Sequence, residues 1–137
     1  MKNKSFVLDT NIWITLFYNK QELFFYNLIK ENELIILRSI ELTNELEKVL
    51  NYPKVIKKLV HHKEYYIDLF FDATHNIKTT PIFTSCPDPN DNYLFDLAYQ
   101  SNADYLVSGD KDVLNTPIVE PLQIISFSEF KSLINIL

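Results

Sequence analysis

Two short apolar runs that each lead into an aspartate constrain the fold of this chain most strongly. Residues 6–8 are apolar and precede Asp9, and residues 105–107 precede Ser108, Gly109 and Asp110. Short apolar runs of this kind are typical of buried parallel strands. Ligands of an open α/β sheet bind beyond the carboxyl ends of such strands. We therefore expect Asp9 and Asp110 to share one polar site, with a sharp backbone turn at Gly109, the only glycine.

Strands and helices alternate along the rest of the chain. Apolar runs predict strands at residues 5–8, 34–37, 76–79, 105–107 and 124–126, with helical segments between them and after the last one. This alternation predicts an α/β protein with three layers, α/β/α, around a central parallel sheet of about four to five strands.

Several residues predict where individual helices begin. Ser39 is an expected N-cap for a helix to residue 50, which should bury Ile40 and Leu46. Asp88 and Pro89 are expected to open a helix that ends near residue 101. Residues 126–129, Ser-Phe-Ser-Glu, have the pattern of a capping box for a terminal helix.

Length and composition predict a single domain spanning residues 1–137. The chain is 47% hydrophobic and 23% charged, as in ordinary globular proteins. It contains no apolar run long enough for a membrane span, and its charged start leads directly into a strand, so no signal peptide is expected. Cys86, the only cysteine, cannot form an internal disulfide, and we expect a cytoplasmic location.

The charge distribution leaves the class of partner open. A net charge of −5 argues against binding of a polyanion, but residues 54–63 form a basic run with no acid. Lys54, Lys57 and Lys58 in this run could contact an RNA backbone or an acidic partner, or could simply form a solvated helix face.

Four acidic residues are candidates for a shared metal site. Asp9 and Asp110 follow strands, Asp91 lies in the first turn of a predicted helix, and Glu45 lies within the helix after Ser39. Convergent carboxylates suit Mg²⁺, which prefers oxygen ligands. Such an ion can activate water and offset charge on a reacting phosphoryl group.

Each of these residues also has a purely structural interpretation. Asp91 could complement a helix dipole, Glu45 could be one more solvated helix residue, and Asp110 could be a turn residue after Gly109. Asp9 is harder to explain in this way, because Thr10 and Asn11 place two more polar side chains at the same strand exit.

The order and spacing of four motifs resemble the PIN-domain family of metal-dependent ribonucleases over nearly the whole chain. The motifs are residues 7–11 (Val-Leu-Asp-Thr-Asn), residues 42–50 around Glu45, residues 88–91 (Asp-Pro-Asn-Asp) with Leu97-Ala98, and residues 103–112 ending in Gly-Asp-Lys-Asp. Within the family, the chain is most similar to VapC-like toxins of toxin–antitoxin pairs.

The resemblance implies a function for the acidic residues. Asp9, Glu45, Asp91 and Asp110 would be catalytic, and Asp9, Asp91 and Asp110 would hold Mg²⁺ or Mn²⁺, so that activated water hydrolyses RNA phosphodiester bonds. Supporting roles would fall to the following polar residues: Thr10, Asn11, Ser108, Asp88 and Asp112. A small antitoxin protein would be the expected partner of such a hydrolase.

One departure from the family pattern bears on the number of ions. Relatives often carry a denser acidic run where this chain has Asn90, Asp91 and Asn92, and asparagine is a neutral, weaker ligand. We therefore expect one firmly held ion and a transient second.

Two other functions were weighed against the ribonuclease. A non-catalytic PIN-like module that binds RNA or protein is the main alternative, although the retained acids argue against it. A phosphatase with Asp9 as nucleophile is disfavoured, because haloacid-dehalogenase-like enzymes typically carry an aspartate where this chain has Asn11. The many aromatic residues of the first helices and of residues 65–71 could line a homodimer face or an antitoxin groove.

Overall fold

A parallel sheet organises residues 3–135, the part of the chain that the computed structural model describes. Its five strands have the order β3-β2-β1-β4-β5, and every neighbouring pair is parallel. The strands are β1 (Ser5–Leu8), β2 (Ile35–Arg38), β3 (His75–Asn76), β4 (Tyr105–Val107) and β5 (Gln123–Ile125). The predicted fold class is confirmed.

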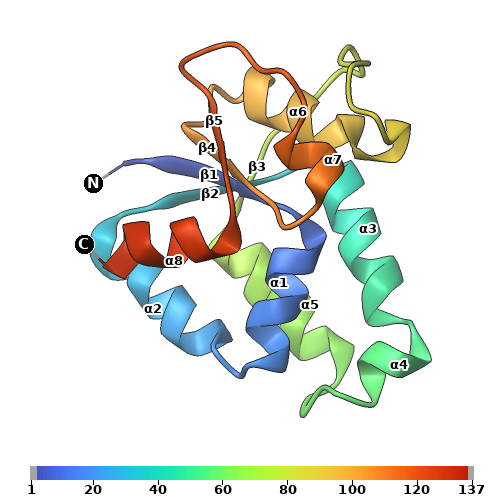
Figure 1. The fold of residues 1–137 in the computed structure, drawn as a ribbon. Coiled ribbons are helices and arrows are strands. Elements are labelled where there is room, and N and C mark those ends of the chain that lie inside the picture. The colour runs from blue at the N-terminus through green and yellow to red at the C-terminus, as the bar shows by residue number, and fades with distance from the viewer. Residues whose placement is uncertain (1–2, 136–137) are drawn as a thin grey trace.

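Helices cover both faces of the sheet. Figure 1 shows α1, α2, α5 and α8 on one side of the strands and α6 on the other. The helices are α1 (Thr10–Tyr18), α2 (Glu22–Asn32), α3 (Ile40–Leu50), α4 (Pro53–Ile56), α5 (Lys63–Ala73), α6 (Asn92–Gln100), α7 (Lys111–Leu114) and α8 (Phe127–Asn135), and a 3₁₀ turn, η1, spans Pro89–Asp91. None of the helices described between residues 3 and 135 is long and apolar enough to cross a membrane.

The order of the strands creates a switch point between β1 and β4. From β1 the chain first builds the β2–β3 side of the sheet and then returns to add β4 and β5 on the other side. β1 and β4 pair in register, with Phe6 opposite Tyr105 and Leu8 opposite Val107. Both strands therefore end at the same level, where doubly wound sheets bind their ligands.

The core fills both faces of the central strand. Phe6, Val7 and Leu8 are fully buried, as expected for a strand between two helical layers. Trp13 on α1 packs edge-on against Phe25 and Phe70, with ring centroids 5.9 and 5.0 Å apart. α1 is thus fixed against α2 and α5, and its first residues are held at the end of β1.

Helix capping follows the sequence closely. The Ser39 hydroxyl accepts a hydrogen bond from the Leu42 N–H at 3.3 Å, which fixes the start of α3. At α8, Glu129 Oε1 accepts from the Ser126 N–H and Ser126 Oγ accepts from the Glu129 N–H, at 3.0 and 3.1 Å. The predicted capping box is confirmed.

The structure corrects one expectation about burial, at Ile40, and it shows no need for glycine at the expected turn. Ile40 is 63% exposed rather than buried, because Leu42, Leu46 and Leu50 carry the inner face of α3 and Ile40 lies off that face. Gly109 does not adopt a left-handed backbone conformation, and a Cβ atom there would meet nothing within 4 Å. The segment after β4 therefore does not require glycine.

Several elements also differ from the prediction, and β2 and β5 are each shifted by one residue. The third strand lies at His75–Asn76 rather than residues 76–79. The segment after Asp88 begins as the 3₁₀ turn η1, and α6 starts only at Asn92. The short helix α7, which follows Asp110, has no counterpart in the predicted elements.

Candidate active site

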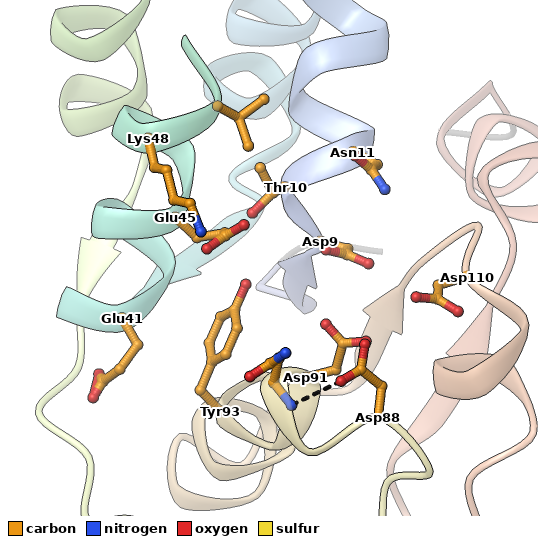
Figure 2. A pocket seen from close by; sticks show the side chains of 12 residues that line it. Asp9, Thr10, Asn11, Glu41, Glu45, Lys48, Asp88, Asp91, Tyr93 and Asp110 are labelled. Carbon is orange, nitrogen blue, oxygen red and sulfur yellow. Dashed lines mark hydrogen bonds between the residues drawn. The ribbon is translucent and has the colours of Figure 1, made fainter. Parts of the chain in front are cut away.

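A polar pocket lies beyond the carboxyl ends of β1 and β4. Its volume is about 430 Å³, and residues of four segments that are distant in sequence line it. Six of the lining residues are carboxylates: Asp9, Glu41, Glu45, Asp88, Asp91 and Asp110. The others are Thr10, Asn11, Lys48, Val49, Asn90 and Tyr93. Figure 2 shows how these side chains surround the pocket.

Asp9 and Asp110 are linked through Ser108. The Ser108 hydroxyl donates to Asp9 Oδ2 at 2.7 Å and accepts from the Asp110 N–H at 3.0 Å. Ser108 is fully buried and Asp9 is 6% exposed, so water competes little for these bonds. The β1–β4 pairing extends one residue further, because the Asp9 N–H donates to the Val107 carbonyl at 2.9 Å. The two strand exits thus form one rigid unit.

α3 brings two more carboxylates to the opposite side of the pocket. Glu41 and Glu45 are four residues apart and therefore lie on the same face of the helix. The cap at Ser39, directly after β2, fixes the point from which this face projects. Glu45 points into the pocket in Figure 2, and it forms no hydrogen bond within residues 3–135.

The turn η1 contributes the remaining acids. Asp88 Oδ1 accepts from the Asn90 N–H at 3.0 Å, and this cap orders the turn. Asp91 ends η1 and precedes α6, where helix dipoles favour negative charge. Its Oδ2 is buried without a hydrogen-bond partner.

Burial and repulsion from neighbouring acids raise the pKa values of two of the carboxylates, Asp91 and Asp9. Burial raises the pKa of Asp91 to about 7, and repulsion from Asp9, Asp110 and Asp88 adds to this effect. Burial also raises the pKa of Asp9; the hydrogen bond from Ser108 opposes the shift, and the charges of Asp110 and Glu45 reinforce it. A bound cation would relieve this repulsion.

The donor set fits a hard divalent cation. All six acids offer oxygen ligands, and three oxygens of the lining residues are buried without a partner: Asp91 Oδ2, Glu41 Oε1 and Thr10 Oγ1. Within the described range 3–135, however, no three Asp, Glu, His or Cys side chains lie close enough together to form a complete metal site. The carboxylates surround the cavity rather than closing on one point, so binding of an ion would require side-chain rotation.

The structure brings together most of the residues singled out from the sequence. Asp9, Glu45, Asp91 and Asp110 all line the pocket, and so do three of the supporting residues, Thr10, Asn11 and Asp88.

Two other supporting residues lie outside the pocket lining. Ser108 lies beneath the pocket and acts on it through Asp9. Asp112 is exposed and donates its backbone N–H to Asp110 Oδ1 at 2.9 Å, so its contact with the site is through the main chain. Lys54, Lys57 and Lys58 are exposed on and after α4 and do not line the pocket.

Sequence reasoning did not assign Val49, Asn90 and three more distinctive lining residues to the site. Glu41 and Lys48 lie four residues before and three after Glu45, and this helical spacing could have placed them on its face. Tyr93 carried no comparable signal, because aromatic residues are abundant throughout the chain. Its phenol lies between α3 and η1 in Figure 2. Burial raises the pKa of Tyr93, and the nearby carboxylates Asp9, Glu45 and Asp91 also favour the neutral phenol.

Comparisons with known proteins agree with this architecture. No curated protein matches the sequence significantly. The chain is similar in structure to the crystal structure of VapBC2 from Rickettsia felis bound to a DNA fragment from their promoter. The TM-score is 0.61 at 18% identity, and the alignment covers 90% of this chain and 98% of that one. This likeness shows a shared fold.

The sequence itself identifies the family. The profile of the PIN domain matches residues 5–112, which include β1, α3, α6 and β4 and every residue that lines the pocket. The resemblance stated from the motifs is confirmed. The chain belongs to the PIN-domain family.

Proposed function

We propose that this protein is an endoribonuclease that depends on Mg²⁺ or Mn²⁺. The observation that carries the proposal is the gathering of Asp9, Glu45, Asp91 and Asp110 from four segments into one pocket at the switch point of a PIN-domain sheet. Burial, reinforced by repulsion from the neighbouring acids, raises the pKa values of Asp9 and Asp91, and such shifts are typical of functional sites.

Asp9, Asp91 and Asp110 are the residues proposed to hold the ion. One oxygen of Asp9 is fixed by Ser108, and one oxygen of Asp110 is fixed by the Asp112 N–H. Asp91 offers an oxygen that has no other partner. When bound, a divalent cation activates water and offsets the negative charge that develops on a phosphoryl group during hydrolysis.

The remaining residues would position water and substrate. Glu45 faces these aspartates from α3, and its carboxylate is free to orient a water molecule or accept its proton. The side chains of Thr10 and Asn11 line the pocket beside Asp9 and can donate hydrogen bonds to phosphate oxygens. No histidine base is needed, and none lines the pocket in the described part of the chain.

We further propose that the protein is the toxin of a type II toxin–antitoxin pair. The motifs resemble VapC-like toxins, and the structural neighbour from Rickettsia felis is a VapBC complex. A small antitoxin would then be the partner, and the cytoplasm, where RNA and a reduced Cys86 coexist, would be the site of action.

The decisive experiment compares Asp9→Asn with Asp68→Asn. Asp68 is exposed on α5, outside the pocket, so its substitution makes the same charge change elsewhere. The wild-type protein and Asp68→Asn should cleave single-stranded RNA with Mg²⁺ or Mn²⁺ and lose this activity in EDTA. Asp9→Asn should retain the wild-type circular-dichroism spectrum and lose cleavage.

The outcomes separate the proposal from its main alternative. Cleavage that survives EDTA or Asp9→Asn would refute a metal-dependent site at Asp9. RNA binding without cleavage in every metal tested would favour the non-catalytic module. Expression in bacteria tests the toxin role, since growth inhibition should disappear with Asp9→Asn and persist with Asp68→Asn.

A further inference from the structure

Lys48 is the one basic side chain among the described residues that line the acidic pocket. It lies on α3, three residues after Glu45 and seven after Glu41, so all three side chains project from the same helix face. Lys48 is exposed, and in Figure 2 its chain extends along α3 toward the carboxylate of Glu45.

Lys48 is also unengaged, unlike several other lysines. Within residues 3–135 its side chain makes no hydrogen bond, ion pair or ring contact. By contrast, Lys4 lies 3.9 Å from Asp104 Oδ1, and Lys63 donates to Asn51 Oδ1 at 2.8 Å. Lys30 lies 5.2 Å from the centre of the Tyr26 ring. The ammonium group of Lys48 is therefore free to meet a ligand in the pocket.

The negative charge of the pocket indicates what the Lys48 ammonium group could do for a polyanionic substrate. Six carboxylates line the pocket, so it keeps an excess of negative charge even after one divalent cation has bound. A polyanionic substrate would be repelled by the acids that no cation neutralises. Lys48 is the side chain of the pocket that can offset this repulsion without occupying a ligand position.

The place of Lys48 identifies which phosphate it can reach. In Figure 2, Lys48 lies on the opposite side of the pocket from Asp110, with Glu45 and Thr10 between them. Along α3, Lys48 is about 4.5 Å beyond Glu45, given a rise of about 1.5 Å per residue. α3 then leads to α4, where Lys54, Lys57 and Lys58 are exposed (Figure 1).

We propose that Lys48 binds the phosphate next to the reacting one and so directs single-stranded RNA out of the pocket along α3 toward α4. The inference rests on the proposed nuclease function, and it specifies the path along which the RNA strand leaves the pocket. Lys48 is a substrate-binding residue in this scheme and takes no part in the chemical step.

The test uses Lys48→Gln, Lys48→Arg and Lys30→Gln. Lys30 is an exposed lysine of α2, so Lys30→Gln controls for loss of one positive charge. Binding of a short fluorescent single-stranded RNA is measured by anisotropy with Mg²⁺, each substitution being combined with Asp9→Asn to prevent cleavage. Lys48→Gln should weaken binding about tenfold, as expected for loss of a charged hydrogen bond, and Lys48→Arg should restore most of it.

Salt dependence distinguishes a phosphate contact from a structural role. The slope of log K against log salt should become shallower by about 0.7 in Lys48→Gln, which is the value for one phosphate contact in a single strand. In proteins with an intact Asp9, Lys48→Gln should raise KM more than it lowers kcat. Equal binding and equal slopes for Lys48→Gln and Lys30→Gln would overturn the inference.

The two proposals fail in different ways. If the wild-type protein cleaves RNA and the two variants Lys48→Gln and Lys30→Gln change this cleavage equally, the nuclease function is supported and the role of Lys48 is refuted. RNA binding that depends on Lys48, in a protein that cleaves no RNA with any metal, would leave the binding role standing and remove the nuclease.

Discussion

A serine, rather than an acid, determines how the two strand-exit aspartates lie. Ser108 is fully buried and contacts the Asp9 side chain and the Asp110 main chain at once. A buried hydroxyl with both a donor and an acceptor partner gives a fixed orientation, because leaving either partner unpaired is costly. The geometry of the proposed metal ligands therefore depends on a neutral residue.

Replacing Ser108 by alanine should destabilise the protein by about 1–3 kcal/mol, because Asp9 Oδ2 loses its donor and the Asp110 N–H loses its acceptor. Urea unfolding would measure the change. Ser101→Ala is a suitable control, since it removes one 3.3 Å hydrogen bond to the Ala98 carbonyl at the end of α6. Equal losses in both variants would contradict a special role for Ser108.

Asp91 should make the metal-free protein less stable as the pH rises. Its pKa is about 7 in the fold and 3.8 in an unfolded chain, so between these values the native state holds a proton that the unfolded state has released. The free energy of unfolding then falls as the pH rises from about 4 to 7, and the contribution is constant above that range.

Asp91→Asn removes this titration. The stability of the variant relative to wild type should increase over the same pH range, by on the order of 1 kcal/mol, since solvent screens a half-buried carboxylate. Denaturant unfolding in EDTA at several pH values tests this. Asp112→Asn is the control, because Asp112 is exposed and outside the pocket lining. If the difference in unfolding free energy between Asp91→Asn and wild type does not vary with pH, the raised pKa of Asp91 is refuted.

At the scale of elements, local sequence patterns predicted the main strands and the helix N-caps, but they did not predict a short helix or the exposure of one side chain. β1 and the strand at Tyr105–Val107 matched the prediction, because an apolar run bounded by polar residues is a local signal. The caps at Ser39 and Ser126 also matched. By contrast, α7 was missed because a four-residue helix has almost no periodicity to read, and Ile40 is exposed because Leu42, Leu46 and Leu50 carry the inner face of α3.

The capping box of α8 provides a prediction at this scale. Ser126→Ala and Glu129→Ala should each cost about 1 kcal/mol, because each leaves an N–H at the helix start without its acceptor. Glu129→Gln should cost much less, since glutamine can accept the same bond. Thermal unfolding would measure these effects. All three variants should keep the metal response of wild type, because α8 contributes no residue to the pocket.

At the scale of the whole molecule, the sequence could indicate that a site exists but not all of its members. Parallel strands followed by aspartates predicted that Asp9 and Asp110 would meet, and the structure places both at the switch point. Glu41, Lys48 and Tyr93 join them only because α3 and α6 pack against each other and present these faces to the same cavity. Helical spacing could have placed Glu41 and Lys48 beside Glu45, but the position of Tyr93 depends on how α6 packs against α3, which no local pattern encodes.

Metal binding should be visible as stability of the whole fold. An ion that binds only the native state stabilises it by about 2.7 kcal/mol at a concentration one hundred times its Kd. Mn²⁺ or Mg²⁺ should therefore raise the unfolding midpoint of wild type, and the increase should grow with pH as Asp91 loses its proton. Asp110→Asn should reduce the effect, and Asp68→Asn should preserve it.

Calorimetric titration with Mn²⁺ should then show one firmly bound ion and a much weaker second. Asn92 cannot serve as an additional ligand, because its Oδ1 accepts the Cys86 N–H at 3.0 Å and the residue does not line the pocket. Asn90 does line the pocket, but a neutral amide is a weaker ligand than a carboxylate. Two sites of equal, high affinity would contradict this expectation and would require Glu41 and Glu45 to hold the second ion.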